Sequence, residues 1–257
     1  MNDVRGDGKE KVKVNLIDEK KLKAIMKRFC GSKATDEEVT KWYCCKDGLH
    51  YMATTLGSSV EIYFKNKFAG TYNPLGETYY TKPTKDAEIV KAIEQYVEVK
   101  DGKKKKLMKT GHVLEFPDVH GIFDKFNLDE FGKVVFDAEE FDEIIQVHET
   151  MESMEKMSGR SFTSVLRIKD NKLFFTVYDT PFKFMYEKQK ETNAEINTYF
   201  YNPTYVINIF KSLKDLGVDK VEMLIKPNQP ILFQASSLEY LYKFALNRKV
   251  VAKNVQK

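Results

Sequence analysis

The chain has 257 residues, a formal net charge of +4, and 18 Phe and 14 Tyr against 13 Gly and 7 Pro. This length allows two ordinary domains with separate cores, and the aromatic content excludes a largely disordered chain. Because the charge is nearly balanced, any contact with nucleic acid must come from local placement of Lys and Arg.

The three cysteines do not form a disulfide framework, because their number is odd and Cys44 and Cys45 are adjacent on a predicted strand. There is no Cys-x-x-Cys, so structural zinc is not expected. The charged start lacks an apolar signal segment, and no apolar run approaches the ~18 residues of a membrane span. We therefore expect an intracellular protein without membrane contact, metal or cofactor.

In the first half, polar residues 1–10 are expected to fray, and a strand then leads to Asp18, a helix N-cap. Leu22, Ile25, Met26 and Phe29 form the apolar stripe of that helix. Further strands, a second helix that Pro83 opens and two closing strands are predicted. The two helices are predicted at 18–29 and 84–96. The strands are predicted at 11–17, 39–45, 49–55, 59–64, 78–81, 97–100 and 106–115.

The segment 117–132 is rich in apolar residues and precedes a second series of elements, which follows the plan of the first. Pro203 opens its second helix and Gly217 ends it. A loop is expected at 153–159. The two helices are predicted at 137–149 and 203–216. The strands are predicted at 134–136, 162–168, 173–178, 182–187, 195–201, 220–225, 230–235 and 239–246.

An internal repeat is the strongest pattern in the chain. Residues 199–204 repeat 79–84, with Pro83 and Pro203 120 residues apart. The helix-opening Asp18 and Asp137, and the turn residues Asp47 and Asp170, recur at nearly the same spacing. We therefore predict an α+β protein with two copies of one module, each with two helices packed on antiparallel sheets. The domains are expected at 11–116 and 133–250, joined by a connector at 117–132.

Catalytic motifs are absent from the sequence. There is no P-loop, Gly-x-Gly-x-x-Gly, Gly-x-Ser-x-Gly or His-Glu-x-x-His, and the four histidines are scattered. His148 falls on the apolar face of its helix, where a half-buried and hydrogen-bonded histidine is the expected interpretation. The sequence argues against an enzyme.

The repeated module resembles the DNA sliding clamps, in particular the two-domain type typified by proliferating cell nuclear antigen and its phage counterparts. Residues 200–211 resemble the strand-to-helix segment of that family, and 221–225 with 229–233 resemble its C-terminal strand pair. The resemblance implies a homotrimeric ring around double-stranded DNA, with sheets outside and helices lining the hole. The weaker match of the first half suggests a diverged phage or viral clamp.

The resemblance also implies sequence-independent contact between helix-borne cations and phosphates. The residues expected there are Lys20, Lys23, Lys27, Arg28, Lys91, Lys211 and Lys214. A simple solvated lysine face is the alternative. The third helix departs from the family, because its polar side carries Glu139, Asp142, Glu143, Gln146 and Glu149. Either this helix lies away from the hole, or the DNA follows the other helices, or there is no ring.

A hydrophobic pocket beneath the connector is the second implied site, where peptide motifs of the polymerase and clamp loader would bind. The residues expected there are Ile122, Phe123, Phe126, Leu128, Pro230 and Ala245. The alternative is that these side chains only fasten the connector to the sheet. The leading function is therefore a processivity factor. A monomeric clamp-like adaptor that binds DNA and polymerase without encircling DNA, and a plain protein-interaction module, remain open.

Overall fold

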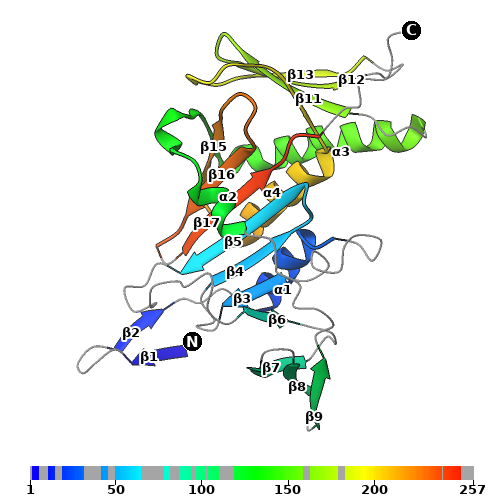
Figure 1. Ribbon diagram of the computed structural model, residues 1–257. Helices are drawn as coiled ribbons and strands as arrows, with labels where there is room; N and C mark the ends of the chain where they lie inside the picture. The colour runs from blue at the N-terminus through cyan, green and yellow to red at the C-terminus, as the bar shows by residue number, and fades with distance from the viewer. Residues whose placement is uncertain are drawn as a thin grey trace. The chain divides into compact units, whose positions relative to one another are not determined.

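The structure is a computed structural model, shown in Figure 1. It describes residues 2–5, 11–14, 19–31, 42–45, 50–64, 78–81, 87–93, 96–101, 104–109, 119–158, 163–178, 183–238 and 240–249. The chain divides into two compact units, one of Met1–Ile122 with Ser236–Tyr242 and one of Phe123–Ala235 with Lys243–Lys257. Every strand pairing found among the described residues is antiparallel, which confirms the α+β class expected from the sequence.

The second unit contains two sheets. In one, the strands lie in the order β10 (Gly132–Asp137), β15 (Lys220–Ile225), β16 (Ile231–Ser236) and β17 (Tyr240–Leu246). The other has the order β13 (Met185–Gln189), β12 (Lys172–Tyr178), β11 (Thr163–Lys169) and β14 (Ile196–Tyr201). The predicted turn between β11 and β12 is confirmed. Asp170 and Asn171 both have positive φ, as a tight two-residue hairpin turn requires.

Helix α4 (Pro203–Leu216) begins and ends at the residues that the sequence predicts. The Asn202 side chain accepts a hydrogen bond from the Thr204 N–H at 3.0 Å, and Pro203 occupies the first turn. Gly217 ends the helix with a φ of 67°, a left-handed conformation that glycine adopts without a Cβ clash. Local sequence signals are sufficient to define this helix.

Helix α3 (Phe141–Ser158) follows the short 3-10 turn η3 (Ala138–Glu140) and continues further than expected. The loop predicted at 153–159 is wrong for residues 153–158, which are helical. Glu152 explains the extension, because it pairs with Lys156 one turn on at 2.7 Å and accepts a hydrogen bond from the Thr204 hydroxyl at 2.7 Å. These contacts stabilise an additional turn that the polar sequence does not reveal.

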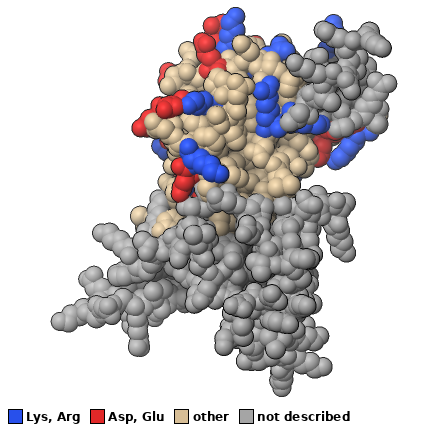
Figure 2. Space-filling model, in the orientation of Figure 1, with Lys and Arg blue, Asp and Glu red and all other residues tan. Residues whose placement is uncertain are grey.

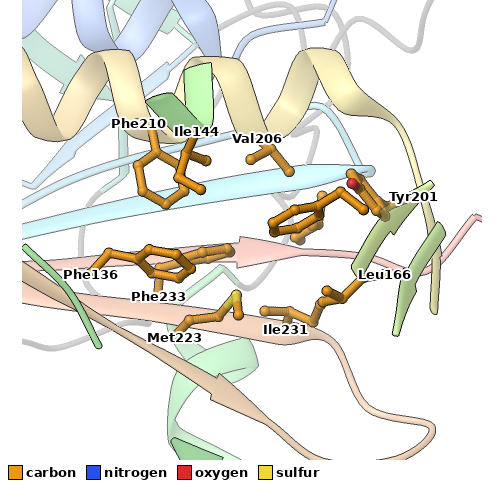
Figure 3. Close-up of a pocket in the computed structure, with 11 residues that line it drawn as sticks. Phe136, Ile144, Leu166, Tyr201, Val206, Phe210, Met223, Ile231 and Phe233 are labelled. Atoms are coloured by element: carbon orange, nitrogen blue, oxygen red, sulfur yellow. The ribbon is translucent and has the colours of Figure 1, made fainter. Parts of the chain in front are cut away.

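Aromatic side chains join the two helices to the sheet beneath them. The Phe210 ring of α4 makes edge contacts with Phe136, Phe141 and Phe233 at centroid distances of 5.4–6.0 Å. Figure 3 shows a void that the rings of Phe136, Phe210 and Phe233 help to line, with Val206 and Ile231 facing it. No polar surface lines this void, which is about the size of one water molecule, so it is part of a dry core rather than a binding site.

Two buried polar side chains tie elements of this core together. His148 of α3 is fully buried, with Nδ1 2.7 Å from the Ile144 carbonyl and Nε2 2.9 Å from the Tyr201 hydroxyl. The sequence predicts a satisfied but half-buried histidine, so its burial exceeds the expectation. The Tyr199 hydroxyl donates to the Leu246 carbonyl at 2.6 Å and accepts from the Ile231 N–H at 3.3 Å. Both groups therefore replace their lost hydration with hydrogen bonds.

A close approach occurs where β10 begins. An added Cβ on Gly132 would lie 2.4 Å from the Ala194 Cα. Beside it, the Lys133 N–H donates to the Asn193 side chain at 2.9 Å, and the Thr192 hydroxyl donates to the Lys133 carbonyl at 2.7 Å. Glycine is required here because the two backbones are in contact.

The first unit also combines a helix with antiparallel strands. The strands β5 (Ser58–Phe64), β4 (His50–Thr54), β3 (Trp42–Cys45) and β6 (Thr78–Thr81) lie in that order. Helix α1 (Glu19–Arg28) lies near β4 and buries the predicted stripe of Leu22, Ile25, Met26 and Phe29. A three-stranded sheet has the order β7 (Ala87–Ile93), β8 (Tyr96–Asp101) and β9 (Lys104–Lys109).

Two expectations for this unit are wrong. The helix predicted at 84–96 is replaced over Ala87–Ile93 by β7, which pairs with β8. The segment is rich in β-branched residues, and the equally β-rich strand at Tyr96–Asp101 offers it a partner, so pairing overrides the helical periodicity. Within the segment 1–10 that was expected to fray, the described residues form β1 (Asn2–Arg5), which pairs with β2 (Lys11–Val14).

Candidate functional site

Helix α1 presents a cationic surface. It has five basic residues and one acidic residue, and Lys20, Lys23 and Lys27 are exposed opposite the buried stripe, with Arg28 half-buried. Four of the predicted DNA-contacting residues therefore lie on one helix. Lys91 does not join a helical surface, because it lies on strand β7 beside a bulge in the pairing with β8.

The α3 and α4 surface has the opposite balance, with six acidic and three basic residues on the two helices together. Lys211 of α4 pairs with Glu149 of α3 at 2.6 Å, and Lys214 pairs with Asp142 at 2.6 Å. Figure 2 shows another face of the molecule, on which blue and red side chains both occur and lie beside one another toward the left of the view. The two lysines predicted on the α3 and α4 surface are thus bound to carboxylates of the neighbouring helix.

The acidic residues at the start of α3 contact the edge strand β13. Glu143 accepts hydrogen bonds from Lys188 and from the Tyr186 hydroxyl, and these bonds hold the pKa of Glu143 below its usual value. Glu140 pairs with Lys188 at 3.0 Å and also with Lys190. Burial, together with the bond to Glu143, raises the pKa of Tyr186 to about 12. This part of the acidic surface is neutralised from the sheet, whereas Glu139 and Gln146 are exposed.

The connector forms α2 (Val119–Asp124) and the 3-10 turn η2 (Leu128–Glu130). Together with strands β15, β16 and β17 it surrounds a small, mainly apolar pocket. The Lys243 ammonium lies 5.5 Å from the Phe123 ring centre and 3.7 Å from the Asp124 carboxylate. The residues that line the pocket are Phe123, Leu128, Leu224, Leu232, Phe233, Gln234 and Lys243.

The second half of the connector is fixed to the sheet. The rings of Phe126 and Phe131 make an edge contact at 5.7 Å, and the Lys226 ammonium lies 5.9 Å from the Phe131 ring centre. Lys226 also pairs with Glu130, and this hydrogen bond lowers the pKa of the Glu130 carboxyl. The connector thus has two parts. Phe126, Glu130 and Phe131 fasten it to its surroundings, and Phe123 of α2 and Leu128 of η2 help to line the pocket.

Of the six residues predicted for the pocket, Phe123 and Leu128 line it. Ile122 is half-buried on α2, and Phe126 contacts Phe131 instead. Pro230 and Ala245 do not line the pocket, although each lies two residues from a residue that does.

Five residues that line the pocket were not predicted from the sequence, namely Leu224, Leu232, Phe233, Gln234 and Lys243. Alternation along the predicted strands could have identified part of this set. Leu232 and Gln234 share a face of β16, and Lys243 shares a face of β17 with Ala245.

No protein-family model matches the sequence, and no curated protein matches it either. Solved structures do match. Proliferating Cellular Nuclear Antigen from Entamoeba histolytica has a TM-score of 0.53 at 12% identity, covering 90% of this chain and 94% of that one. The beta subunit of DNA polymerase III from Thermotoga maritima has a TM-score of 0.59 at 14% identity. The DNA polymerase sliding clamp from Pseudomonas aeruginosa has a TM-score of 0.59 at 15% identity. This chain has the DNA sliding-clamp fold.

The clamp fold extends over 89% of this chain in both bacterial comparisons, while the chain spans only 64% of the length of each bacterial protein. At 12–15% identity the similarity shows that the fold is shared but not that individual side chains have the same roles. Each proposed role therefore depends on the geometry of this chain. Within the described residues, no helix has the length and apolar character needed to cross a bilayer. The same residues contain no cluster of three or more His, Cys, Asp or Glu placed to hold a metal ion.

Proposed function

We propose that this protein is a DNA polymerase processivity factor, a sliding clamp whose protomers close into a ring around duplex DNA and tether replication proteins. The observation that carries the proposal is the exposed cationic side of α1 on a clamp fold. Duplex DNA is a dense line of phosphates, and lysines on a helix contact phosphates without reading the base sequence. Contacts of this kind permit sliding. The protein itself performs no catalysis.

The connector pocket would bind peptide segments of the polymerase and of a clamp loader. Its interior is mainly apolar and has room for about one water molecule, so an apolar side chain of the peptide would enter only as the connector moves outward, and burying that side chain would contribute about 1.5–3 kcal/mol. Lys243 at its rim, now paired with Asp124, would attract a carboxylate of the peptide. Residues Phe123, Leu128 and Leu232 are the proposed apolar contacts.

A homotrimer is the proposed assembly. Strand β13 ends one sheet and β9 ends another, so in the described part of the chain each has a neighbouring strand on one side only. Exposed edges of this kind promote pairing with another chain, and closing a ring of identical protomers removes them. The membrane has no role in this proposal.

Light scattering across a concentration series is the first test. A stable species of three times the 29.9 kDa chain is the expected result. Retention on DNA is the second test, because a loaded ring stays on a closed circle and slides off a linear molecule. A triple variant, Lys20→Glu, Lys23→Glu and Lys27→Glu, should lose binding to DNA at low salt while keeping its mass.

A monomeric adaptor that binds DNA on one side is the second candidate, and the acidic surface of α3 favours it. A monomer at micromolar concentration that leaves circular and linear DNA at the same rate would support the adaptor and contradict the ring. Absence of any DNA binding at low salt would contradict both and leave a protein-interaction module.

A further inference from the structure

The lysines of α4 contact α3 along one seam between the helices. Lys211 and Lys214 are three residues apart on α4, and Asp142 and Glu149 are seven apart on α3, so each pair lies on one helical face. The pairing runs antiparallel, because Thr204 contacts Glu152 at the other end. Two acceptors on one helix thus match two donors on the next.

We infer that α3 holds Lys211 and Lys214 of α4 away from DNA, which leaves the phosphate contacts to other cations of the chain. The inference rests on the proposed function. It assigns a role to the acidic third helix, which otherwise conflicts with a DNA-binding clamp. The carboxylates of Asp142 and Glu149 act as internal substitutes for phosphate oxygens at Lys214 and Lys211.

The ion pairs are too weak to keep the two lysines from DNA by their own stability. The side chains of Lys211 and Glu149 are 43% and 48% exposed, and exposed pairs of this kind contribute only about 0–1 kcal/mol. The cost arises when a phosphate replaces the carboxylate. The displaced carboxylate stays nearby as a second anion, and like charges at about 4 Å repel by about 1 kcal/mol even in bulk water. Replacing a carboxylate with a DNA phosphate at Lys211 or Lys214 therefore adds little binding free energy.

Helix α1 differs in composition, with five basic residues beside a single acidic one, Glu19. A phosphate that approaches α1 meets few competing carboxylates on the same helix. The salt dependence of binding reports how many phosphate contacts the whole chain makes. Each additional phosphate contact steepens the slope of log affinity against log salt by about 0.9.

The test uses the full chain and a fluorescent 30-base-pair duplex, with binding measured by anisotropy at several salt concentrations. The variant Asp142→Asn with Glu149→Gln removes both carboxylates and keeps their shape. We expect binding roughly tenfold tighter at low salt and a slope steeper by about one to two, as two contacts require.

Two controls separate release of the lysines from a simple change in net charge. The variant Glu191→Gln with Glu195→Gln changes the net charge equally, at two exposed residues outside the helices. It should leave the slope unchanged. Adding Lys211→Ala and Lys214→Ala to the Asp142→Asn, Glu149→Gln variant should abolish the gain. Circular dichroism checks that every variant is folded.

The outcomes distinguish this inference from the proposed function. If the wild type binds and the carboxylate variant matches the control variant, the inference is overturned and the clamp proposal stands. The same conclusion follows if the gain survives removal of both lysines. If neither the wild type nor the variant binds at 50 mM salt, both are overturned. If only the carboxylate variant binds, the inference is supported and the wild-type α1 contact is overturned.

Discussion

Helix α1 and the α3–α4 pair both bury an apolar side and expose a charged one, but they arrange their charges differently. On α1 the excess is cationic, and on α3–α4 it is anionic, with Lys211 and Lys214 held by carboxylates. The difference shows that counting lysines on a helix does not identify a phosphate-binding surface. On α4 the neighbouring helix α3 already supplies the anions.

Removing the buried ring of Phe210 is expected to cause the largest loss of stability in the α3–α4 region. Phe210→Ala deletes the contacts with Phe136, Phe141 and Phe233, and a loss of about 3–5 kcal/mol of unfolding free energy is expected. Urea denaturation followed by circular dichroism measures it. Phe126→Ala, at a half-buried ring of the connector, should cost clearly less. Equal losses would contradict a core centred on α4.

Acid should weaken the α3–α4 region through His148, a titrating group for which α1 has no counterpart. Burial lowers the pKa of His148 to about 4, and the groups that face it are the Ile144 carbonyl, the Tyr201 hydroxyl and the Phe175 ring. The unfolded chain, with a His pKa of about 6.5, binds the proton first. Stability is therefore complete above pH 6.5 and falls as the pH decreases toward 4.

The expected loss is about 2–3 kcal/mol between pH 7 and pH 4.5, as linkage requires for this shift. Denaturation at half-unit pH steps measures it. His148→Gln keeps hydrogen-bonding groups but does not titrate, so its stability should be lower at pH 7 and much flatter across the same range. A wild-type curve as flat as that of the variant would rule out this role for His148.

The smallest effect concerns the start of α4. Asn202→Ala removes the side chain that accepts the Thr204 N–H, and such caps contribute about 1 kcal/mol. Thermal unfolding should show a correspondingly lower midpoint. Asn197→Ala, at an exposed position of β14, should stay within about 0.5 kcal/mol of the wild type. A cap variant indistinguishable from Asn197→Ala would mean that packing alone defines the start of the helix.

Local signals predicted much of the second unit. Asn202, Pro203 and Gly217 define α4, and the turn at Asp170 and Asn171 defines the β11–β12 hairpin. The same approach failed at Ala87–Ile93, where helical periodicity and strand propensity compete and the partner strand decides.

The candidate sites were less accessible to sequence analysis. Phe123 and Leu128 could be predicted for the pocket because the connector is unusually apolar. Lys243 could not, since its place at the rim depends on how β17 meets α2 in three dimensions. The pairs of Lys211 with Glu149 and of Lys214 with Asp142 link residues more than 60 positions apart, and no spacing rule along one helix reveals them.

The contact between Gly132 and Ala194 has a consequence for how this protein can change over generations. Any replacement of Gly132 introduces at least a Cβ, which would lie 2.4 Å from the Ala194 Cα and 2.8 Å from its nitrogen. Trimming Ala194 to glycine would not make room, because the obstructing atoms belong to the backbone. A side chain at position 132 therefore requires the backbone around residue 194 to shift. The side chain allowed at position 132 therefore depends on the backbone path of a segment about 60 residues further along the chain.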